Sequence, residues 1–301
     1  MEMLDKILGI RFPIIQGAMG RIADGTFASE CSNAGILGTI ATGGMTADEV
    51  KREITVCKES TKYPFAVNII MNHPDLEYLS DMIVSMEVPV VILSNGNALK
   101  LIKRLKEENV IVLPVLGTPE FAKFYQRAGA DAIIAEGNES GGHIGPMTTM
   151  TLVPQMCDEV DIPVIAAGGI GDHRQFEAAK ALGACGIQIG TVLLASFECP
   201  VHENYKMAVL KAKGSSSVVT GKIFGDEVRV LKNYMTNRYF ELEKTGDVDE
   251  IKNMLTGSYY KAVVEGDIEN GSIMAGQVCG QLHSTKQLKE IIEDIYYGKT
   301  G

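Results

Sequence analysis

One histidine in this chain stands in a glycine-rich segment of the kind that forms active-site loops. The segment follows a short apolar run and reads Glu136-Gly-Asn-Glu-Ser-Gly-Gly-His-Ile-Gly-Pro-Met-Thr-Thr-Met-Thr151. Glycine lets the backbone approach a ligand closely, and histidine is the side chain whose unperturbed pKa lies nearest neutrality. We therefore predict an active-site loop that carries His143. A glycine-rich turn whose histidine only caps or packs is the structural alternative.

Two further glycine-containing turns have the character of phosphate sites. Gly168-Gly169 ends the apolar run Ala-Ala-Gly-Gly-Ile, and Gly190-Thr191 ends the run Gln-Ile-Gly-Thr. Backbone N–H groups in such turns can cradle a phosphate group, and the Thr191 hydroxyl is an added donor. A tight turn without a ligand is the alternative for each of them.

Polar side chains inside apolar runs raise a related question. Asn68 stands in Phe-Ala-Val-Asn-Ile-Ile, where burying an amide without partners would cost about 1 to 3 kcal/mol. It is either a satisfied core amide or a contact for a cofactor ring, and Gln16 and Gln188 pose the same choice. The other four histidines have polar or turn-like surroundings and are predicted to be surface residues: His73, His173, His202 and His283.

Eight short apolar runs would position these groups. They cover residues 13–17, 37–42, 65–71, 88–95, 110–116, 132–137, 163–169 and 186–191, and helical segments between them include 48–59, 98–108, 120–128 and 174–182. Apolar strands that alternate with helices are typical of a parallel sheet covered on its faces. Eight units predict an α/β fold, a (β/α)8 TIM barrel, with its active site at the C-terminal ends of the strands. A doubly wound open sheet is the alternative, but no G-x-G-x-x-G follows the first strand.

The alternation stops near Ala195. Residues 200–281 have a helical pattern with polar turns at 214–217 and 245–249 and without convincing strands, and a closing helix is expected at about 285–297. We therefore expect a cofactor-binding barrel domain made of residues 1–199 and 282–301. Residues 200–281 would form a helical insertion that caps the substrate region.

Composition limits the class of protein. The 301 residues are 46% hydrophobic and carry a formal charge of -10, which argues against a nucleic-acid partner because such binding needs a basic surface. The six scattered cysteines include no C-x-x-C pair, so neither a metal site nor a disulfide framework is expected, and most should be reduced and buried. There is no basic and apolar leader and no apolar run near the roughly 18 residues of a membrane span. We expect a cytoplasmic protein without a membrane partner.

Four motifs together resemble those of the FMN-dependent enoyl-acyl-carrier-protein reductases, within the nitronate monooxygenase (2-nitropropane dioxygenase) superfamily. They are Ser-Gly-Gly-His-Ile-Gly at 140–145, Ala-Ala-Gly-Gly-Ile at 166–170, Gln-Ile-Gly-Thr at 188–191 and Met-Ala-Gly-Gln at 274–277. The resemblance runs in order from Leu4 to about Tyr297, and includes Pro-Phe-Ala-Val-Asn at 64–68 and Arg-Val-Leu-Lys-Asn at 229–233. The ordered set is specific for the superfamily and less specific for the member.

The resemblance implies an FMN at the barrel mouth, with its phosphate in the two glycine turns. His143 matches the histidine beside the flavin, which in a reductase helps to place the thioester or supplies a proton and in a nitronate oxidase acts as a base. The residues that the resemblance assigns to the cofactor are Gly17, Ala18, Met19, Asn68, Glu136, Gly141, Gly142, Gly168, Gly169, Gly190, Thr191, Met274 and Gln277.

We favour a reductase in which NADH or NADPH reduces FMN and the reduced flavin passes hydride to the β-carbon of an enoyl thioester. The substrate would be a small molecule or an acyl-carrier-protein thioester of fatty acid biosynthesis, and a homodimer stays open. The first alternative is a nitronate monooxygenase, in which the reduced flavin meets oxygen. A barrel lyase or isomerase that holds a substrate phosphate and a non-catalytic flavin-binding protein are further alternatives.

Two loops depart from the reductase pattern. The reductases usually carry Gly-Gly-Met-Ala-Trp after the first strand and Gly-Ala-Gly-Asn-Pro after the fourth, whereas this chain has Gly17-Ala-Met-Gly-Arg21 and Ser94-Asn-Gly-Asn-Ala98. Both loops would border the substrate space. Flavin binding is therefore better supported by the sequence than the identity of the substrate.

Overall fold

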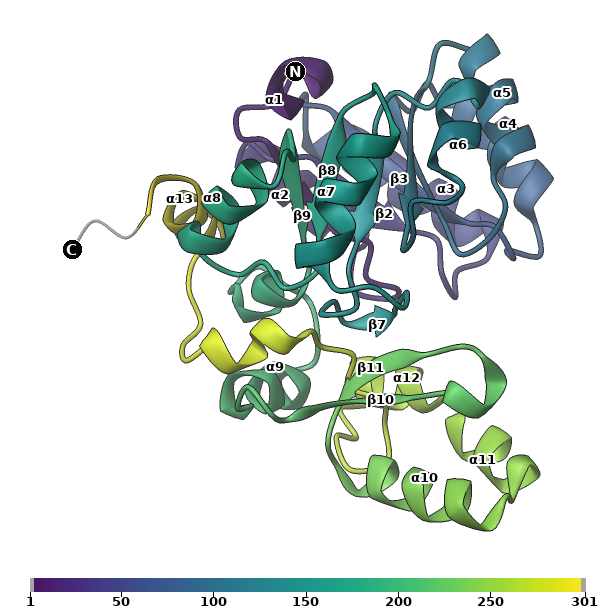
Figure 1. The fold of residues 1–301 in the computed structure, drawn as a ribbon, viewed down its shortest axis with the longest axis vertical. Helices are drawn as coiled ribbons and strands as arrows, with labels where there is room; N and C mark the ends of the chain where they lie inside the picture. The colour runs from purple at the N-terminus through teal and green to yellow at the C-terminus, as the bar shows by residue number, and fades with distance from the viewer. Residues whose placement is uncertain (1–2, 299–301) are drawn as a thin grey trace.

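Eight parallel strands form a barrel in the computed structural model, which describes residues 3–298 (Figure 1). The strands are β1 (Ile14–Gln16), β2 (Gly38–Ala41), β3 (Phe65–Ile70), β4 (Val90–Ser94), β5 (Ile111–Leu116), β6 (Ile133–Glu136), β8 (Val164–Ala167) and β9 (Gly186–Ile189). Their order in the sheet is β1-β9-β8-β6-β5-β4-β3-β2, and a parallel bridge between Ile15 and Leu37 brings the two edges together. The predicted barrel is confirmed, and each predicted apolar run contains one strand.

Helices surround this barrel. They are α2 (Gly25–Asn33), α3 (Ala47–Ser60), α4 (Leu76–Ser85), α5 (Leu99–Glu107), α6 (Ala122–Ala128), α7 (Thr149–Glu159), α8 (His173–Ala181) and α13 (Leu288–Tyr297). Capping boxes define two of their starts, since Thr46 and Asp172 each accept from the backbone three residues on and receive a bond in return. The helices expected from the sequence are present with ends that differ by a few residues.

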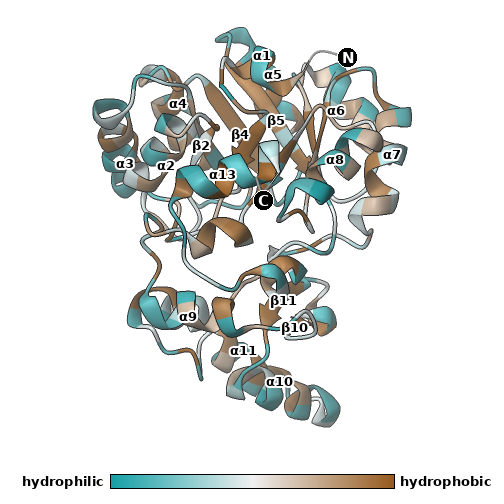
Figure 2. Ribbon diagram, turned by 90° about the vertical axis from the view of Figure 1, so that its left-hand side faces the viewer, coloured by the Kyte–Doolittle hydropathy of each residue, from teal (hydrophilic) through white to brown (hydrophobic). Residues whose placement is uncertain are grey.

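The barrel interior is apolar at its N-terminal end. Leu4 and Leu8 of α1 (Leu4–Leu8) close that end and pack on Ile15, Leu37 and other strand residues. Figure 2 shows the strands as hydrophobic and the outer turns of the helices as largely hydrophilic. The closed end leaves only the C-terminal end of the strands open to a ligand.

An insertion between β9 and α13 lies against that C-terminal end (Figure 1). The short helix η1 (Thr191–Ala195) follows β9 directly. The insertion, residues 200–281, contains α9 (Glu203–Lys211), β10 (Ser217–Thr220), η2 (Lys222–Phe224), β11 (Val228–Leu231), α10 (Tyr234–Thr245), α11 (Val248–Leu255), α12 (Ser258–Tyr260), η3 (Lys261–Glu265) and η4 (Gln277–Gln281). The hairpin of β10 and β11 lies on the side of the insertion next to the barrel, and α10 and α11 lie at its far end (Figure 1).

The prediction that residues 200–281 contain no strands is wrong. β10 and β11 form an antiparallel hairpin, and β7 (Gly142–His143) adds to β11 as a third strand. Each strand of the hairpin has only four residues, which is too short for a clear alternating pattern. Its partner β7 comes from the barrel, so no local sequence signal marks the sheet.

Five of the six cysteines are buried, Cys157 is half-buried, and all six are free thiols. No helix within residues 3–298 is both long enough and apolar enough to cross a bilayer.

Candidate active site at the C-terminal end of the barrel

The strands carry several of the predicted site residues to one end of the barrel. Gly17 and Gly190 directly follow β1 and β9, and Gly17 N donates to Ile189 O at 2.7 Å. Glu136 ends β6, and Gly168 follows β8. Because parallel strands point the same way, these positions share the C-terminal end, where barrel enzymes bind their substrates.

Inward-pointing polar side chains line the barrel below these turns. Ala66, Ile92 and Ile134 belong to the interior cluster, and side chains alternate along a strand, so the residues two positions further on point inward as well. Asn68 is one of them, and its Nδ2 donates to Ile92 O at 3.2 Å and to Ser94 Oγ at 3.0 Å. Asn68 is thus a hydrogen-bonded amide whose side chain points into the barrel below the strand-end turns.

Several buried polar atoms in this region have no hydrogen-bond partner within the described residues. They are Gln16 Nε2, Thr39 Oγ1, Thr42 Oγ1, Ser140 Oγ and Gln188 Oε1. Leaving such an atom unpaired costs about 1 to 3 kcal/mol. Ser140 belongs to the His143 loop and Gln188 to β9, so a ligand at this end of the barrel that offers both donors and acceptors would satisfy these two atoms. They therefore fit the polar edge of the flavin ring that the sequence resemblance implies.

The two glycines of the β8–α8 turn have reasons to be glycine that involve no ligand. Gly168 and Gly169 have φ of 88° and 74°, in the left-handed region that side chains rarely adopt. A Cβ on Gly168 would lie 2.5 Å from Gly137 O, and one on Gly169 would lie 3.1 Å from Glu139 Cβ. The turn therefore packs directly on the loop that leads to His143.

Gly190 differs from these glycines. Its φ is -128°, and a Cβ there would meet only Met19, with Sδ at 3.7 Å. Neither conformation nor packing requires glycine at this position. Because Met19 belongs to the loop after β1, Gly190 lies between two strand-end loops, where a phosphate could approach the backbone.

The segment 274–277 returns from the insertion to the His143 loop. A Cβ on Gly141 would lie 2.7 Å from Ala275 C, and Gln277 N donates to Glu139 O at 2.9 Å. Thr191 Oγ1 accepts from Gly276 N at 2.8 Å, so this hydroxyl ties η1 to the returning segment and keeps its proton for a ligand. The structure therefore brings Met274 and Gln277 to the glycine-rich loop and joins Thr191 to the same returning segment.

His143 lies at the edge of the three-stranded sheet rather than inside the barrel. Its side chain is 54% exposed, and its Nε2 lies 3.5 Å from Asp226 Oδ1. The sheet register pairs His143 with Val228, and Ile144 N donates to Glu227 O at 3.0 Å. The histidine is therefore held by the insertion as well as by the barrel.

The protein environment changes the pKa of the Glu136 carboxyl. Burial raises the pKa of the Glu136 carboxyl to about 7, and the neighbouring Ser140 hydroxyl opposes this shift. Ser140 Oγ has no hydrogen-bond partner of good geometry, so the effect of burial on the pKa of Glu136 outweighs that of the hydroxyl. A carboxyl that titrates near neutrality at a barrel mouth is a candidate functional group.

Two residues that the sequence did not single out also belong to this region. Asp226 faces His143, and Tyr259 donates from its hydroxyl to Gly20 O at 2.6 Å, which joins the insertion to the loop after β1. Tyr259 and Gly20 are 239 positions apart. Neither residue stands in a motif, so no local signal could have identified it.

The prediction of a surface position is wrong for His73. This residue is only 5% exposed, because its ring bridges two strand-end loops: Nε2 lies 3.0 Å from Met45 O, and Nδ1 accepts from Asp75 N at 3.0 Å. His283 is exposed, as expected, and His173 and His202 are half-buried.

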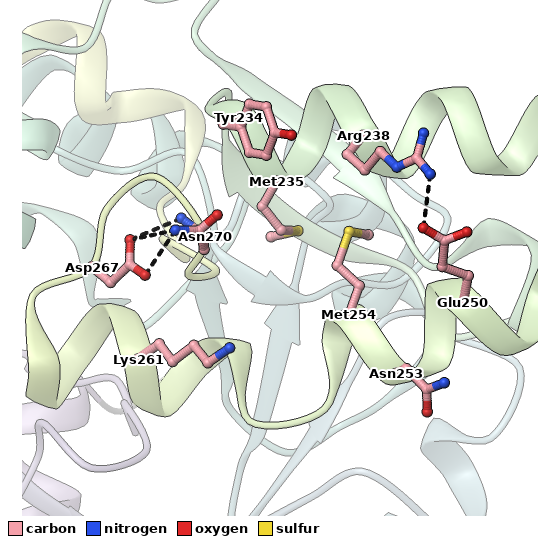
Figure 3. Close-up of a pocket in the computed structure, with 9 residues that line it drawn as sticks. All are labelled: Tyr234, Met235, Arg238, Glu250, Asn253, Met254, Lys261, Asp267 and Asn270. Carbon is pink, nitrogen blue, oxygen red and sulfur yellow. Dashed lines mark hydrogen bonds and ion pairs between the residues drawn. The ribbon is translucent and has the colours of Figure 1, made fainter.

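A groove of about 340 Å³ lies in the insertion, between α10, α11 and the turns after them (Figure 3). It contains none of the predicted site residues. Four of its charged and polar side chains pair with each other, since Arg238 Nη2 lies 2.7 Å from Glu250 Oε1 and Asn270 Nδ2 donates to Asp267. Residues 3–298 hold no group of three or more histidine, cysteine or acidic side chains arranged for a metal.

Comparison with known proteins identifies a matching family and several similar proteins. The model of the nitronate monooxygenase family matches residues 1–84 and 78–298. FabK from Thermotoga maritima is similar in structure, with a TM-score of 0.94 and 43% sequence identity over 97% of this chain and 94% of that chain. The (3aS,4S,5R,7aS)-5-hydroxy-7a-methyl-1-oxo-octahydro-1H-indene-4-carboxyl-CoA dehydrogenase of Rhodococcus jostii is 36% identical over 245 residues, which are 81% of this chain and 69% of the relative. The probable nitronate monooxygenase of Staphylococcus saprophyticus is 32% identical over 284 residues, covering 79% of this chain and 80% of the relative.

Proposed function

The chain belongs to the nitronate monooxygenase family, as its motifs predicted, and on that premise we propose that it is an FMN-dependent reductase of enoyl thioesters with NADH or NADPH as electron donor. The observation that carries this proposal is the likeness to FabK, which spans the barrel and the insertion together at 43% identity. A second relative is named for a reaction of a CoA thioester. A thioester is therefore the substrate class that these relatives favour.

The flavin would supply the redox chemistry, by accepting hydride from the nicotinamide and giving hydride to the β-carbon of the enoyl group. Gly190, Gly169 and Thr191 would hold its phosphate through backbone and hydroxyl donors. The unpaired atoms Ser140 Oγ and Gln188 Oε1 would bond the polar edge of the ring. The residues of the chain thus bind and orient the reacting groups rather than exchange electrons.

His143 would act on the substrate side of the same site. Hydride addition at the β-carbon leaves negative charge on the thioester carbonyl and the α-carbon, and a proton must reach the α-carbon to complete the product. His143 can donate a hydrogen bond to the carbonyl or supply that proton. The insertion, residues 200–281, would cover the substrate through the hairpin beside His143 and the segment 274–277.

Oxidation of alkyl nitronates is the second candidate. It is favoured by the relative from Staphylococcus saprophyticus and by the two loops that depart from the reductase pattern. In that reaction His143 would take the α-proton of a neutral nitroalkane, which leaves the nitronate to be oxidised. The same flavin site serves both reactions, so the substrate alone distinguishes them.

Purified protein incubated with FMN and freed of excess ligand tests the cofactor. We expect a yellow protein whose flavin is released by heat, because no covalent attachment motif is present. Steady-state consumption of NADH or NADPH should then depend on an added enoyl thioester, with the saturated thioester as the product seen by mass spectrometry. A colourless protein that takes up no FMN would contradict the cofactor assignment.

A further inference from the structure

The catalytic-loop histidine is part of a sheet that the insertion builds. β11 pairs with β7 through Val228 with His143 and Arg229 with Gly142, and β10 pairs with β11 over four residues. Arg229 is buried, and its Nε donates to Asn138 O at 2.8 Å, in the loop that leads to His143. The backbone around His143 is thus fixed from both sides.

The turn of this hairpin is fixed as well. Gly221 N donates to the hydroxyl of Tyr239 on α10 at 2.8 Å, and Asp226 N donates to Gly221 O at 3.3 Å. Gly221 has φ of 84°, and a Cβ there would lie only 1.9 Å from Asp226 O, so glycine is required. Tyr239 is fully buried. Asp226 therefore stands on a closed, anchored turn rather than on a free loop.

The side chain of Asp226 reaches the ring of His143. Oδ1 lies 3.5 Å from Nε2, beyond a normal hydrogen bond, and both side chains are more than half exposed, so a small rotation of either closes the gap. Catalytic hydrogen bonds are often longer before the substrate complex forms. Within residues 3–298 this carboxylate is the one acidic group within ion-pair distance of the ring.

We propose that Asp226 is the positioning residue for His143, carried to the active site by the hairpin of the insertion. Its carboxylate accepts the Nε2–H of the ring, which fixes the ring orientation and leaves Nδ1 to face the substrate. The kinetic part of this inference rests on the proposed function, because it requires that His143 acts on the substrate.

Glu227 provides a matched control. It follows Asp226 in the same turn and carries the same charge, but its contact with the His143 loop is made by its backbone oxygen, which accepts from Ile144 N. Within residues 3–298 the Glu227 carboxylate makes no ion pair and no side-chain hydrogen bond. Asp226→Ala and Glu227→Ala therefore remove the same charge from the turn, while only the first removes the contact with the ring.

The contact is tested by 15N NMR of histidine-labelled holoenzyme. His143 is one of five histidines, and its ring signal is assigned by its loss in His143→Ala. We expect a ring Nε2–H signal in the wild type and in Glu227→Ala, and its loss to solvent exchange in Asp226→Ala. A ring signal that Asp226→Ala leaves unchanged would overturn the pairing, whatever reaction the enzyme catalyses.

The role is tested by a double-mutant cycle with His143→Ala, with flavin content and melting temperature measured on each preparation. Asp226→Ala should lower kcat about five- to tenfold with KM nearly unchanged, the size of one ion pair at this separation in water-like surroundings. In the His143→Ala background the same change should cost less than about twofold, because the residue acts through the ring. Asp226→Glu should recover part of the loss.

Equal losses in both backgrounds, or an equal loss from Glu227→Ala, would show that Asp226 acts only through the fold and would refute the proposal. If the wild-type enzyme turns over neither an enoyl thioester nor a nitronate, the proposed function fails. The NMR result still decides whether Asp226 positions the ring.

Discussion

Gly190 offers the sharpest test of where the phosphate of the proposed FMN binds. Most other glycines of the site are required by left-handed φ values or by close backbone contacts, so replacing them damages the fold. Gly190 has φ of -128°, and an added Cβ would meet only Met19 Sδ at 3.7 Å, which is ordinary contact. Gly190→Ala should therefore change the free energy of unfolding by no more than about 0.5 kcal/mol.

Its effect on FMN binding should be much larger. A methyl group beside Gly190 would keep the phosphate from the backbone donors of this turn, and one hydrogen bond to a charged group contributes about 1.5 to 3 kcal/mol. At about 1.4 kcal/mol per factor of ten, the Kd for FMN should rise roughly ten- to a hundredfold. Fluorescence titration of the protein without flavin measures this Kd.

Gly214→Ala is the matched control, because Gly214 lies in a turn of the insertion where an added Cβ meets nothing within 4 Å. It should leave both the melting temperature and the Kd for FMN unchanged. If Gly190→Ala folds normally and its Kd stays within about twofold of the wild type, the phosphate does not approach this turn and the assignment of the β9 end is refuted.

Three further substitutions test other parts of the site. His143→Ala should keep FMN but lower kcat about 10²- to 10⁴-fold if the histidine transfers a proton, and wild-type half-reactions in stopped-flow would remove it from the mechanism. Gly168→Ala should lower the melting temperature by several degrees. A residue with a side chain loses roughly 1 to 2 kcal/mol in the left-handed conformation, and the added Cβ would lie 2.5 Å from Gly137 O. An unchanged melting curve would contradict this packing. Burial raises the pKa of Glu136 from 4.5 to about 7 in the folded protein. The native state therefore holds this proton more tightly than the unfolded chain does. The flavin-free protein should lose up to about 3 kcal/mol of unfolding free energy as the pH rises through this range. Glu136→Gln should abolish this part of the pH dependence in urea unfolding at pH 5 and pH 8, and an identical slope in both proteins would contradict it.

The barrel was predictable because its signal is local and repeated. Each of the eight apolar runs is continuous and bounded by turn residues, and the glycine-rich segments fall directly after β6, β8 and β9. The positions of Gly168 and Gly190 at strand ends follow from these apolar runs alone. A parallel sheet imposes this pattern on every strand, so a single sequence carries it.

The contacts between the insertion and the barrel were not predictable in the same way. β10 and β11 are short, and their third partner β7 has only two residues and comes from the loop after β6. Asp226 reaches His143 only because this pairing forms, and Tyr259 reaches Gly20 across 239 positions. His73 was misjudged for the same reason, since the carbonyl that its ring contacts belongs to another loop.

The central claim is that this enzyme delivers electrons from a nicotinamide to an enoyl thioester through FMN. The most direct measurement is anaerobic stopped-flow spectroscopy of the FMN-loaded enzyme, reduced first with one equivalent of NADH or NADPH and then mixed with crotonyl thioester. We predict that the oxidised flavin spectrum returns at least as fast as steady-state turnover and that one equivalent of saturated thioester forms. A reduced flavin that the thioester does not reoxidise, in an enzyme whose oxidised flavin is bleached by an alkyl nitronate, would contradict the claim.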